Sequence, residues 1–203
     1  VRRRRPIGTR RGAAVSEARV MQSQIAEPAE VLAFWRALGP DKWFTRDAEL
    51  DALIRRRYLS THRRAIAGGL SAWEQTAEGA LALILVLDQF PRNMFRGTAH
   101  AFAADPLARG VAARAIACEF DRAFAVPERR FFYLPFMHSE HLGDQERCIR
   151  LCRDADDPEG ARHALIHADI IRRFGRFPHR NAALGRATTP EEQAFLAAGG
   201  FAG

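Results

Sequence analysis

The run Ala80-Leu81-Ala82-Leu83-Ile84-Leu85-Val86-Leu87 carries no polar side chain. A helix that is apolar on every side is buried at the centre of a protein. The same run also fits a buried parallel strand, but Ala and Leu are strong helix formers and the surrounding sequence has helical spacing. We therefore predict a central helix that is capped by Thr76 and extends from Ala77 to about Leu87.

Helical spacing of apolar residues dominates the chain after Met21, and no convincing alternating strand pattern occurs. Proline at first helical positions, polar N-caps and glycine stops mark where helices begin and end. These signals predict helices over residues 29–38, 144–153 and 158–174, one that Thr45 or Asp47 caps and that runs to about residue 67, and one from residue 105 to about 120 or 124. A short last helix is expected at the capping box Thr189-Pro190-Glu191-Glu192. About eight helices with short connections predict an all-α fold of antiparallel helix pairs stacked into an array.

The basic charge of the chain is concentrated in its first 20 residues. These hold seven arginines against one acid, Glu17, whereas residues 21–203 hold 24 basic and 23 acidic residues. An arginine run buries no apolar surface, so we expect residues 1–20 to be a basic, disordered extension and residues 21–203 to be a single all-helical domain. The nearly neutral body disfavours a nucleic-acid surface, so nucleic acid is an expected partner only through the arginine-rich segment.

Three features predict a cytoplasmic protein. No run of about 18 apolar residues is present, so no segment is expected to span a membrane. The basic N-terminal segment is not followed by the apolar part of a secretory signal. Cys118, Cys148 and Cys152 are an odd number of cysteines without a disulfide framework, as in proteins of a reducing compartment.

Two Phe-Pro motifs carry polar residues of chemical interest. Gln89-Phe90-Pro91-Arg92-Asn93 follows the central helix, and Phe174-Gly175-Arg176-Phe177-Pro178-His179-Arg180-Asn181 ends the helix over 158–174. We expect each motif to form a turn and the two turns to share one polar site. Arginine has a planar donor fork that matches carboxylates and phosphates, so an anion is the expected ligand. The predicted ligand-binding residues are Asp88, Gln89, Arg92, Asn93, Arg96, His138, Glu140, His167, Arg176, His179, Arg180 and Asn181.

The arginines near these motifs have two interpretations. In the first, Asp88, Glu140 and Asp169 neutralise them and hold the turns against the helices. In the second, excess arginine and His179 form a cleft that receives an anionic small molecule. Five arginines lie close to the motifs in sequence, against three carboxylates, so some positive potential should remain.

The helix over 158–174 places His163 and His167 on one face, opposite a face of small residues. The plainer interpretation is that both are core histidines that bind backbone carbonyls, and the alternative is that His167 faces a ligand. Two histidines one turn apart are also able to share a metal, with His138, Glu140 or His141 completing the site. The motif lacks the glutamate of a zinc-protease helix, so we expect no metal and no cofactor.

The triplet His138-Ser139-Glu140 contains the residue types of a hydrolase triad. Sequence neighbours rarely supply a triad, because nucleophile and base must converge in space, and no strained nucleophile elbow surrounds Ser139. We therefore expect Ser139 to be a helix N-cap. Glu140 is expected to pair with an arginine from a Phe-Pro turn.

Three motifs of the chain resemble those of a widespread bacterial family of unknown function with a TPR-like helical fold. They are Leu87-Asp88-Gln89-Phe90-Pro91-Arg92-Asn93, Tyr133-Leu134-Pro135-Phe136-Met137-His138-Ser139-Glu140 and the stretch from Arg173 to Asn181. The resemblance extends from about Val31 to Leu196. It implies a TPR-like αα-superhelix in a cytosolic protein, and it implies no particular reaction.

Two functions remain open from the sequence. In the first, the chain is a binding module whose arginine-rich pocket holds a small anionic ligand or peptide. In the second, the chain is an enzyme that performs acid–base chemistry in the same pocket, with arginines stabilising negative charge. The catalytic candidates are His138, Glu140 and His167. The sequence does not predict the oligomeric state.

Overall fold

The computed structural model describes residues 24–201, and no strand occurs in that range. The predicted all-α class is confirmed. Residues 1–20, predicted to be a disordered extension, lie outside the described residues.

The α-helices are α2 (Pro28–Leu38), α3 (Pro40–Trp43), α4 (Ala48–Ile66), α5 (Ala77–Ile84), α6 (Phe90–Met94), α7 (Asp105–Ala117), α8 (Leu134–Met137), α9 (Leu142–Asp154), α10 (Pro158–Phe174) and α11 (Pro190–Ala197). The shorter turns are η1 (Ser71–Gln75), η2 (Leu85–Gln89), η3 (Ala99–Ala101), η4 (Phe120–Ala123), η5 (Glu128–Phe132) and η6 (Pro178–Arg180).

The predicted N-caps explain where several helices begin. The side chain of Thr76 accepts a hydrogen bond from the amide of Gly79 at the start of α5. Asp157 caps α10 in the same way, and Thr189 begins α11 with the predicted capping box. These side chains satisfy amide groups that have no partner within the helix. The predicted starts of these three helices are confirmed.

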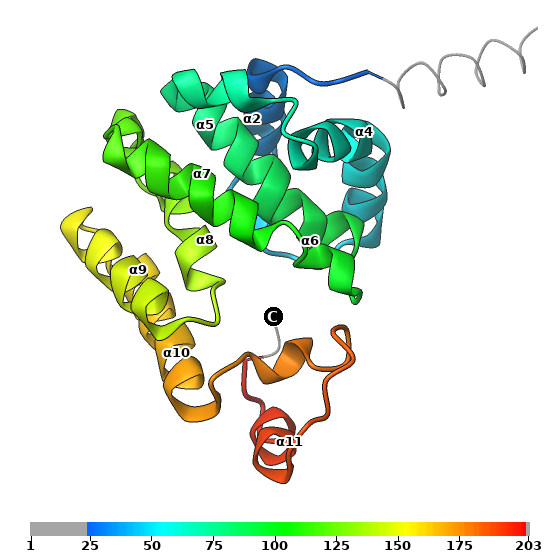
Figure 1. Ribbon diagram of the computed structural model, residues 1–203, viewed down its shortest axis with the longest axis vertical. Helices are drawn as coiled ribbons and strands as arrows, with labels where there is room; N and C mark the ends of the chain where they lie inside the picture. The colour runs from blue at the N-terminus through cyan, green and yellow to red at the C-terminus, as the bar shows by residue number, and fades with distance from the viewer. Residues whose placement is uncertain (1–23, 202–203) are drawn as a thin grey trace, which may run out of the picture.

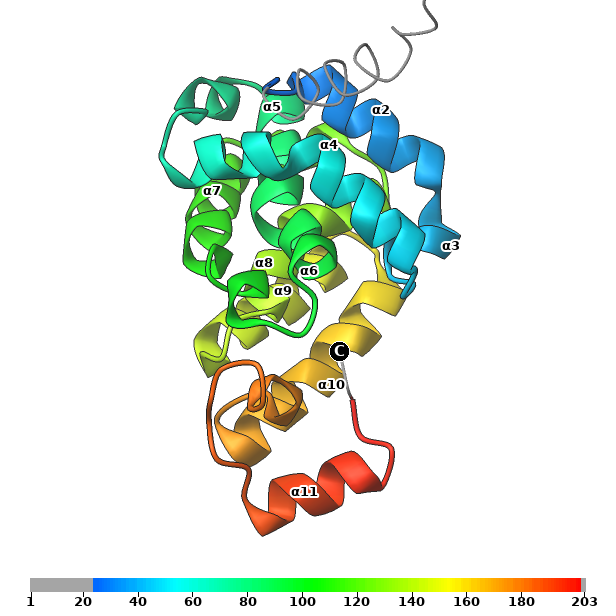
Figure 2. The same ribbon diagram turned by 90° about the vertical axis from the view of Figure 1, so that its right-hand side faces the viewer.

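The helix α5 occupies the centre of the larger part of the molecule. It packs against α2 on one side and α7 on the other, while α4 packs against α6. Helices α9 and α10 lie side by side, and the segment with η6 and α11 follows α10 (Figure 1). This segment lies at the end of the molecule away from α2 and α5 (Figure 2).

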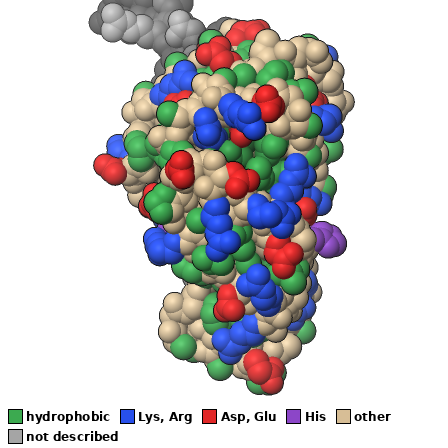
Figure 3. Space-filling view, turned by 90° about the vertical axis from the view of Figure 1, so that its left-hand side faces the viewer, with side chains coloured by type: hydrophobic (Ala, Val, Ile, Leu, Met, Phe, Trp, Pro, Cys, Tyr) green, Lys and Arg blue, Asp and Glu red, His purple; other side chains and the backbone are tan. Residues whose placement is uncertain are grey.

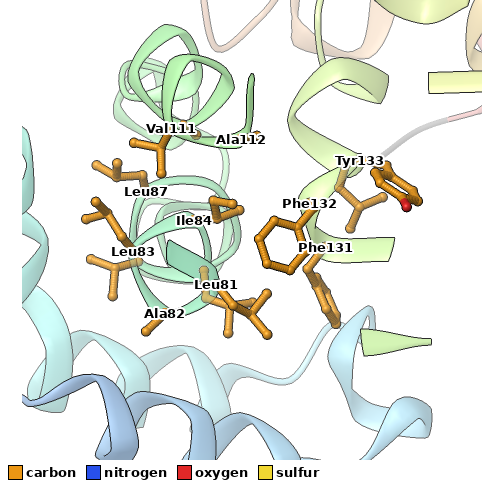
Figure 4. Close-up of a cluster of buried hydrophobic side chains, with 14 of the residues drawn as sticks. Leu81, Ala82, Leu83, Ile84, Leu87, Val111, Ala112, Phe131, Phe132 and Tyr133 are labelled. Atoms are coloured by element: carbon orange, nitrogen blue, oxygen red, sulfur yellow. The ribbon is translucent and has the colours of Figure 1, made fainter. Parts of the chain in front are cut away.

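The run 80–87 is buried on every side, as predicted, with no residue more than 3% exposed. Figure 4 shows its side chains pointing both toward α7 and toward the end of η5. The labelled members of this cluster are Leu81, Ala82, Leu83, Ile84, Leu87, Val111, Ala112, Phe131, Phe132 and Tyr133. Burial of one such side chain contributes about 1.5–3 kcal/mol, so the run anchors the surrounding helices.

The first Phe-Pro motif is not a turn, which corrects the sequence prediction. After Ile84 the helix widens into the π turn η2, in which the amide of Phe90 donates to the carbonyl of Leu85. The helix then continues as α6. In a regular α-helix the ring of Pro91 would clash with the carbonyl of Leu87, four residues earlier. The wider π turn admits the proline without ending the helix.

Side chains satisfy the carbonyl groups that this π turn leaves free. The Nδ1 atom of His62 on α4 donates to the carbonyl of Val86 across 2.9 Å. The guanidinium of Arg92 donates to the carbonyl of Asp88. At the end of α6, Arg55 donates to the carbonyl of Met94 across 2.9 Å. Buried backbone groups need such partners, and these bonds fix the position of Asp88 and Gln89.

The helix predicted over 144–153 begins earlier, at Leu142, and Ser139 is not its N-cap. The Ser139 hydroxyl instead donates to Asp144 Oδ2 across 2.6 Å and accepts from the amide of His141. Ser139 therefore braces the approach to α9 from three residues outside the helix.

Arginine and acidic side chains are interspersed on the face of the molecule that Figure 3 shows. This pattern agrees with the near-zero net charge of residues 21–203. Within residues 24–201, no helix combines the length and the apolar character needed to cross a membrane.

Candidate functional site

A cavity of about 670 Å³ lies where α6, α8 and α10 meet the segment with η6. Its charged and histidine lining consists of Arg46, Arg92, Arg96, Arg130, His138, Glu159, His163, His167, His179 and Arg180. Its other lining residues are Trp43, Phe44, Thr45, Gln89, Asn93, Gly97, Ala101, Phe102, Leu134, Met137, Phe177, Ala183 and Phe201. The two Phe-Pro motifs, 87 positions apart in sequence, thus contribute to the same cavity.

Eight of the twelve residues predicted to bind a ligand line this cavity. They are Gln89, Arg92, Asn93, Arg96, His138, His167, His179 and Arg180. Asp88 lies directly behind them and is fully buried. Their role in binding a ligand stays a prediction.

Asp88 and His138 form the polar centre of the cavity wall. Asp88 Oδ1 lies 2.8 Å from His138 Nδ1, and the side-chain Nε2 of Gln89 donates to Asp88 Oδ2. Burial disfavours the carboxylate, but Arg92 and His138 outweigh that effect and lower the pKa of Asp88 to about 2. An ionised carboxylate only accepts hydrogen bonds, so His138 Nδ1 carries the proton.

Arg92 connects this pair to a second carboxylate, on Asp105. Its Nη1 and Nη2 atoms lie 3.0 and 3.1 Å from the two Asp105 oxygens, which is a bidentate pair. Its Nη1 also lies 3.4 Å from Asp88 Oδ1. Burial opposes the charge of Arg92, yet Asp88 and Asp105 raise its pKa above the usual value. Arg92 is therefore fully neutralised by its neighbours.

Arg180 is also buried, but carboxylates balance its positive charge less well than they balance that of Arg92. Its guanidinium lies 4.6 Å from the ring centres of both Phe102 and Phe177, which stack on it through cation–π contacts. Its closest carboxylate oxygen is Asp105 Oδ2 at 3.5 Å, and that residue already binds Arg92. Burial and the nearby charge of Arg92 lower the pKa of Arg180 to about 10. Its Nε atom is buried and has no hydrogen-bond partner among the described residues.

Two other arginines of the cavity wall are engaged in ion pairs. Arg96 makes a bidentate pair with Asp51 at 2.7 and 2.8 Å, and Asn93 donates to the same carboxylate. Arg130 makes a bidentate pair with Asp157, with both distances 2.7 Å. These contacts join α4 to α6 and η5 to α10, so the two arginines hold the walls of the cavity together.

Two histidines form an aromatic cluster with Phe177 and Phe201. The ring of His167 lies 4.4 Å from that of Phe201 and 5.5 Å from that of Phe177. His179 lies 5.2 Å from Phe201 and 5.6 Å from Phe177. Burial lowers the pKa of His167 to about 4 and that of His179 to about 3. Both rings are therefore neutral at pH 7.

The bond predicted for a core histidine is present at His167, where Nδ1 donates to the carbonyl of His163 across 2.8 Å. Its ring also lines the cavity, so the two interpretations of His167 are compatible. The Nδ1 atom of His179 is buried and has no hydrogen-bond partner among the described residues. Residues 24–201 contain no group of three or more ligating side chains close enough to hold a metal.

Besides Asp88, three predicted ligand residues do not line the cavity. Glu140 makes a bidentate pair with Arg186 at 2.7 and 3.0 Å and accepts from the amide of Phe177. Glu140 was expected to pair with an arginine of a Phe-Pro motif, and this expectation is wrong. Its partner, Arg186, follows the second motif in sequence. Arg176 pairs with Glu192 at 2.6 Å, and Asn181 donates to the same carboxylate. These three residues brace the segment that carries η6.

Two residues that contact Arg92 and Arg180, Asp105 and Phe102, were not predicted from the sequence. Asp105 was interpreted only as the start of α7, because Asp-Pro pairs commonly open helices. Asp169, proposed to neutralise the arginines, is exposed on α10. Tertiary packing alone determines that Asp105 binds the arginines of the cavity wall and that Asp169 does not.

Comparison with known proteins gives a family and a related structure. The family model for bacterial proteins of unknown function (DUF924) matches residues 31–200. The chain is also similar to the solved structure of a protein of unknown function, ATU0120, from Agrobacterium tumefaciens. The sequence identity is 48%, the TM-score is 0.80, and the match covers 83% of this chain and 96% of the other. No curated protein matches the sequence.

Proposed function

The chain belongs to the DUF924 family of bacterial proteins of unknown function, and we propose that its cavity binds a small anionic molecule with an apolar body. A volume of about 670 Å³ is in the range of small-molecule pockets, which favours a small molecule over a peptide. In this proposal, Arg180 receives the anionic group and the surrounding aromatic side chains receive the apolar part.

The observation that carries the proposal is that no carboxylate of residues 24–201 forms a bidentate pair with the buried, positively charged guanidinium of Arg180. Arg92 and Arg180 are close to the same carboxylate, but Asp105 holds only Arg92 in a bidentate pair. The pKa of Arg92 is raised, whereas burial and Arg92 lower that of Arg180. A buried cation with a lowered pKa gains free energy when an anion binds beside it. Arg180 is therefore the arginine of the wall best suited to a ligand.

The rest of the wall suits an apolar ligand body. Phe102 and Phe177 flank the Arg180 guanidinium, and Trp43, Leu134 and Met137 add further apolar surface. Such surface contributes about 25 cal/mol for each Å² that a ligand removes from water. A compact inorganic anion would leave this surface unused, so a carboxylate or phosphate on an apolar skeleton is the better ligand class.

Isothermal titration with 4-phenylbutyrate and its uncharged analogue 4-phenylbutanamide tests this proposal. We expect the wild-type chain to bind the carboxylate more tightly than the amide. Arg180→Gln should weaken carboxylate binding about 10- to 150-fold, because a hydrogen bond to a charged group contributes about 1.5–3 kcal/mol. The same substitution should leave the affinity for the amide nearly unchanged.

Arg150→Gln is the matched control, since Arg150 is exposed on α9 and does not line the cavity. Thermal unfolding of each variant establishes that it is folded before titration. Equal affinity of wild-type and Arg180→Gln chains for 4-phenylbutyrate would refute the assignment of Arg180 as the anion-binding residue.

We place this function in the cytoplasm, on a TPR-like superhelix of paired helices. The three free cysteines support a reducing compartment. The side-by-side packing of α9 and α10 supports the paired-helix arrangement. Immunoblotting of fractionated bacterial cells tests the location, and recovery of the protein mainly in the membrane fraction would contradict it.

A further inference from the structure

We propose that the cavity also hydrolyses an ester of its anionic ligand, with His138 as the general base, Asp88 as its positioning residue and water as the nucleophile. This inference rests on the proposed anion-binding function, because Arg180 would hold the substrate. It goes beyond that function by assigning a reaction to a different part of the cavity wall.

The contact between His138 and Asp88 fixes which ring nitrogen is able to accept a proton. His138 Nδ1 donates to the fully buried Asp88 carboxylate across 2.8 Å, so the lone pair of the neutral ring lies on Nε2. The His138 side chain is 16% exposed and lines the cavity. An acid that orients a histidine in this way also stabilises the imidazolium that forms after proton transfer.

The surroundings of His138 keep its ring neutral at pH 7. Burial, followed by the nearby charge of Arg92, lowers the pKa of His138 below its usual 6.5, and Asp88 and Asp105 oppose this effect. The charged or titratable groups that face His138 are Asp88 of η2, Arg92 of α6, Asp105 of α7, His167 of α10 and His179 of η6. A neutral imidazole is the form that a general base requires.

The cavity wall supplies no reactive hydroxyl or thiol to compete with water. The one hydroxyl side chain among the lining residues is Thr45, and its Oγ1 atom donates to the carbonyl of Lys42 across 3.1 Å. None of the lining residues is Ser, Cys or Tyr. Since the wall supplies no activated hydroxyl or thiol, we assign a water molecule as the nucleophile and His138 as its base.

The proposed step balances with water as the sole co-reactant. His138 Nε2 takes a proton from the water molecule while the water oxygen forms a bond to the acyl carbon of the ester. The carbonyl electron pair moves to its oxygen, and the pair returns when the bond to the alkoxide leaving group breaks. The leaving group takes the proton from His138. Ester and water become carboxylic acid and alcohol, and the histidine returns to its neutral form.

The arrangement of charges suggests the substrate class. Arg92 lies between Asp88, which holds His138, and Asp105, which lies beside Arg180. The anion-binding residue and the base are thus joined through a single guanidinium. This proximity fits a short monoester of a dicarboxylic acid, in which a few carbon atoms separate the free carboxylate from the ester.

The p-nitrophenyl monoester of glutaric acid is the test substrate, and p-nitrophenyl valerate is its uncharged analogue. Release of p-nitrophenolate is measured with the full chain. His138→Gln should reduce kcat/KM for the glutarate ester about 100-fold or more, the size of a general-base contribution. Arg180→Gln should raise KM for this ester alone, and exposed His141→Gln is the control that leaves both rates unchanged.

The pH dependence of kcat separates a base from a merely structural histidine. We expect kcat of the wild-type chain to fall as acid protonates His138, with an inflection below pH 6.5, and Asp88→Asn to lower kcat more than it changes KM. Where His138→Gln does not fold, carbethoxylation of the wild-type chain with diethyl pyrocarbonate replaces it. Activity should then disappear in step with modification of His138 and return with hydroxylamine.

Two outcomes distinguish this inference from the function on which it rests. If the wild-type chain binds 4-phenylbutyrate but hydrolyses the glutarate ester no faster than folded His138→Gln, the base assignment is overturned and the binding function stands. The base assignment also falls if carbethoxylation of His138 leaves hydrolysis intact. If 4-phenylbutyrate binding itself does not depend on Arg180, both proposals fall.

Discussion

Replacement of His167 by Gln should make the stability of the fold less sensitive to acid. His167 is 6% exposed, and burial lowers its pKa from the usual 6.5 to about 4. The unfolded chain therefore binds a proton at this residue near pH 6.5, whereas the folded chain binds it only near pH 4. Between these values the unfolded state holds more protons, so the free energy of unfolding falls as the pH falls.

The expected loss of stability follows from the difference between the pKa values of His167 in the unfolded and the folded chain. One pH unit corresponds to about 1.4 kcal/mol for one group, so His167 accounts for about 2 kcal/mol of the stability lost between pH 7.5 and pH 5. His179 adds to the loss in the wild-type chain because burial lowers its pKa to about 3. The wild-type curve should consequently be steep, and the His167→Gln curve should be flatter by about 2 kcal/mol over the same range.

Urea unfolding at pH 7.5, 6 and 5, followed by circular dichroism, measures these differences. His141→Gln is the control, since His141 is exposed and its replacement should leave the pH dependence of the wild-type chain intact. A His167→Gln chain that loses as much stability as the wild-type chain between pH 7.5 and pH 5 would refute the reasoning. That result would mean that His167 is as easily protonated in the folded chain as in the unfolded one.

Two further substitutions test contacts that hold the cavity in place, each by urea unfolding at pH 7.5. Asp157→Asn should cost about 1.5–3 kcal/mol, because it keeps the N-cap of α10 and removes the bidentate carboxylate of Arg130, while Glu159 still binds that guanidinium across 2.9 Å. A loss below about 1 kcal/mol would contradict this. Thr189→Ala should cost about 1 kcal/mol through loss of the α11 cap, whereas Thr189→Ser should restore most of it; equal stabilities for the two variants would argue against a capping role.

The helices could be predicted because their signals are local. The run 80–87 has no polar side that could face water, and it is buried throughout. Asp157 precedes proline at the first position of α10, and its carboxylate accepts from the Gly160 amide as an N-cap should. Such contacts involve residues within one turn of each other, so spacing in the sequence is enough to identify them.

The π turn η2 could not be predicted by the same reasoning. Proline normally ends a helix, so Phe90-Pro91 indicated a turn after Leu87. The helix continues because His62, 24 residues earlier in the chain, provides the donor for the Val86 carbonyl. Part of the compensation for the widened turn thus comes from a different helix, and no local pattern around Pro91 reveals that part.

The charge balance of the cavity also depends on contacts that sequence counting cannot assign. Counting arginines near the motifs placed five cations against Asp88, Glu140 and Asp169. In the fold, Glu140 binds Arg186 and Asp169 is exposed, while Asp105 binds Arg92 of the cavity wall.

The weakest pairing among the buried charges is consequently at one residue, Arg180. Asp88 holds His138 and Asp105 holds Arg92, so the remaining buried cation, Arg180, shares a carboxylate that is already in use. An anion bound to Arg180 would complete the pairing of this group. It would also add negative charge near His138, which favours the protonated imidazole and makes the ring a stronger base. Binding and proton transfer would then be coupled through the same four side chains: Asp88, Arg92, Asp105 and His138.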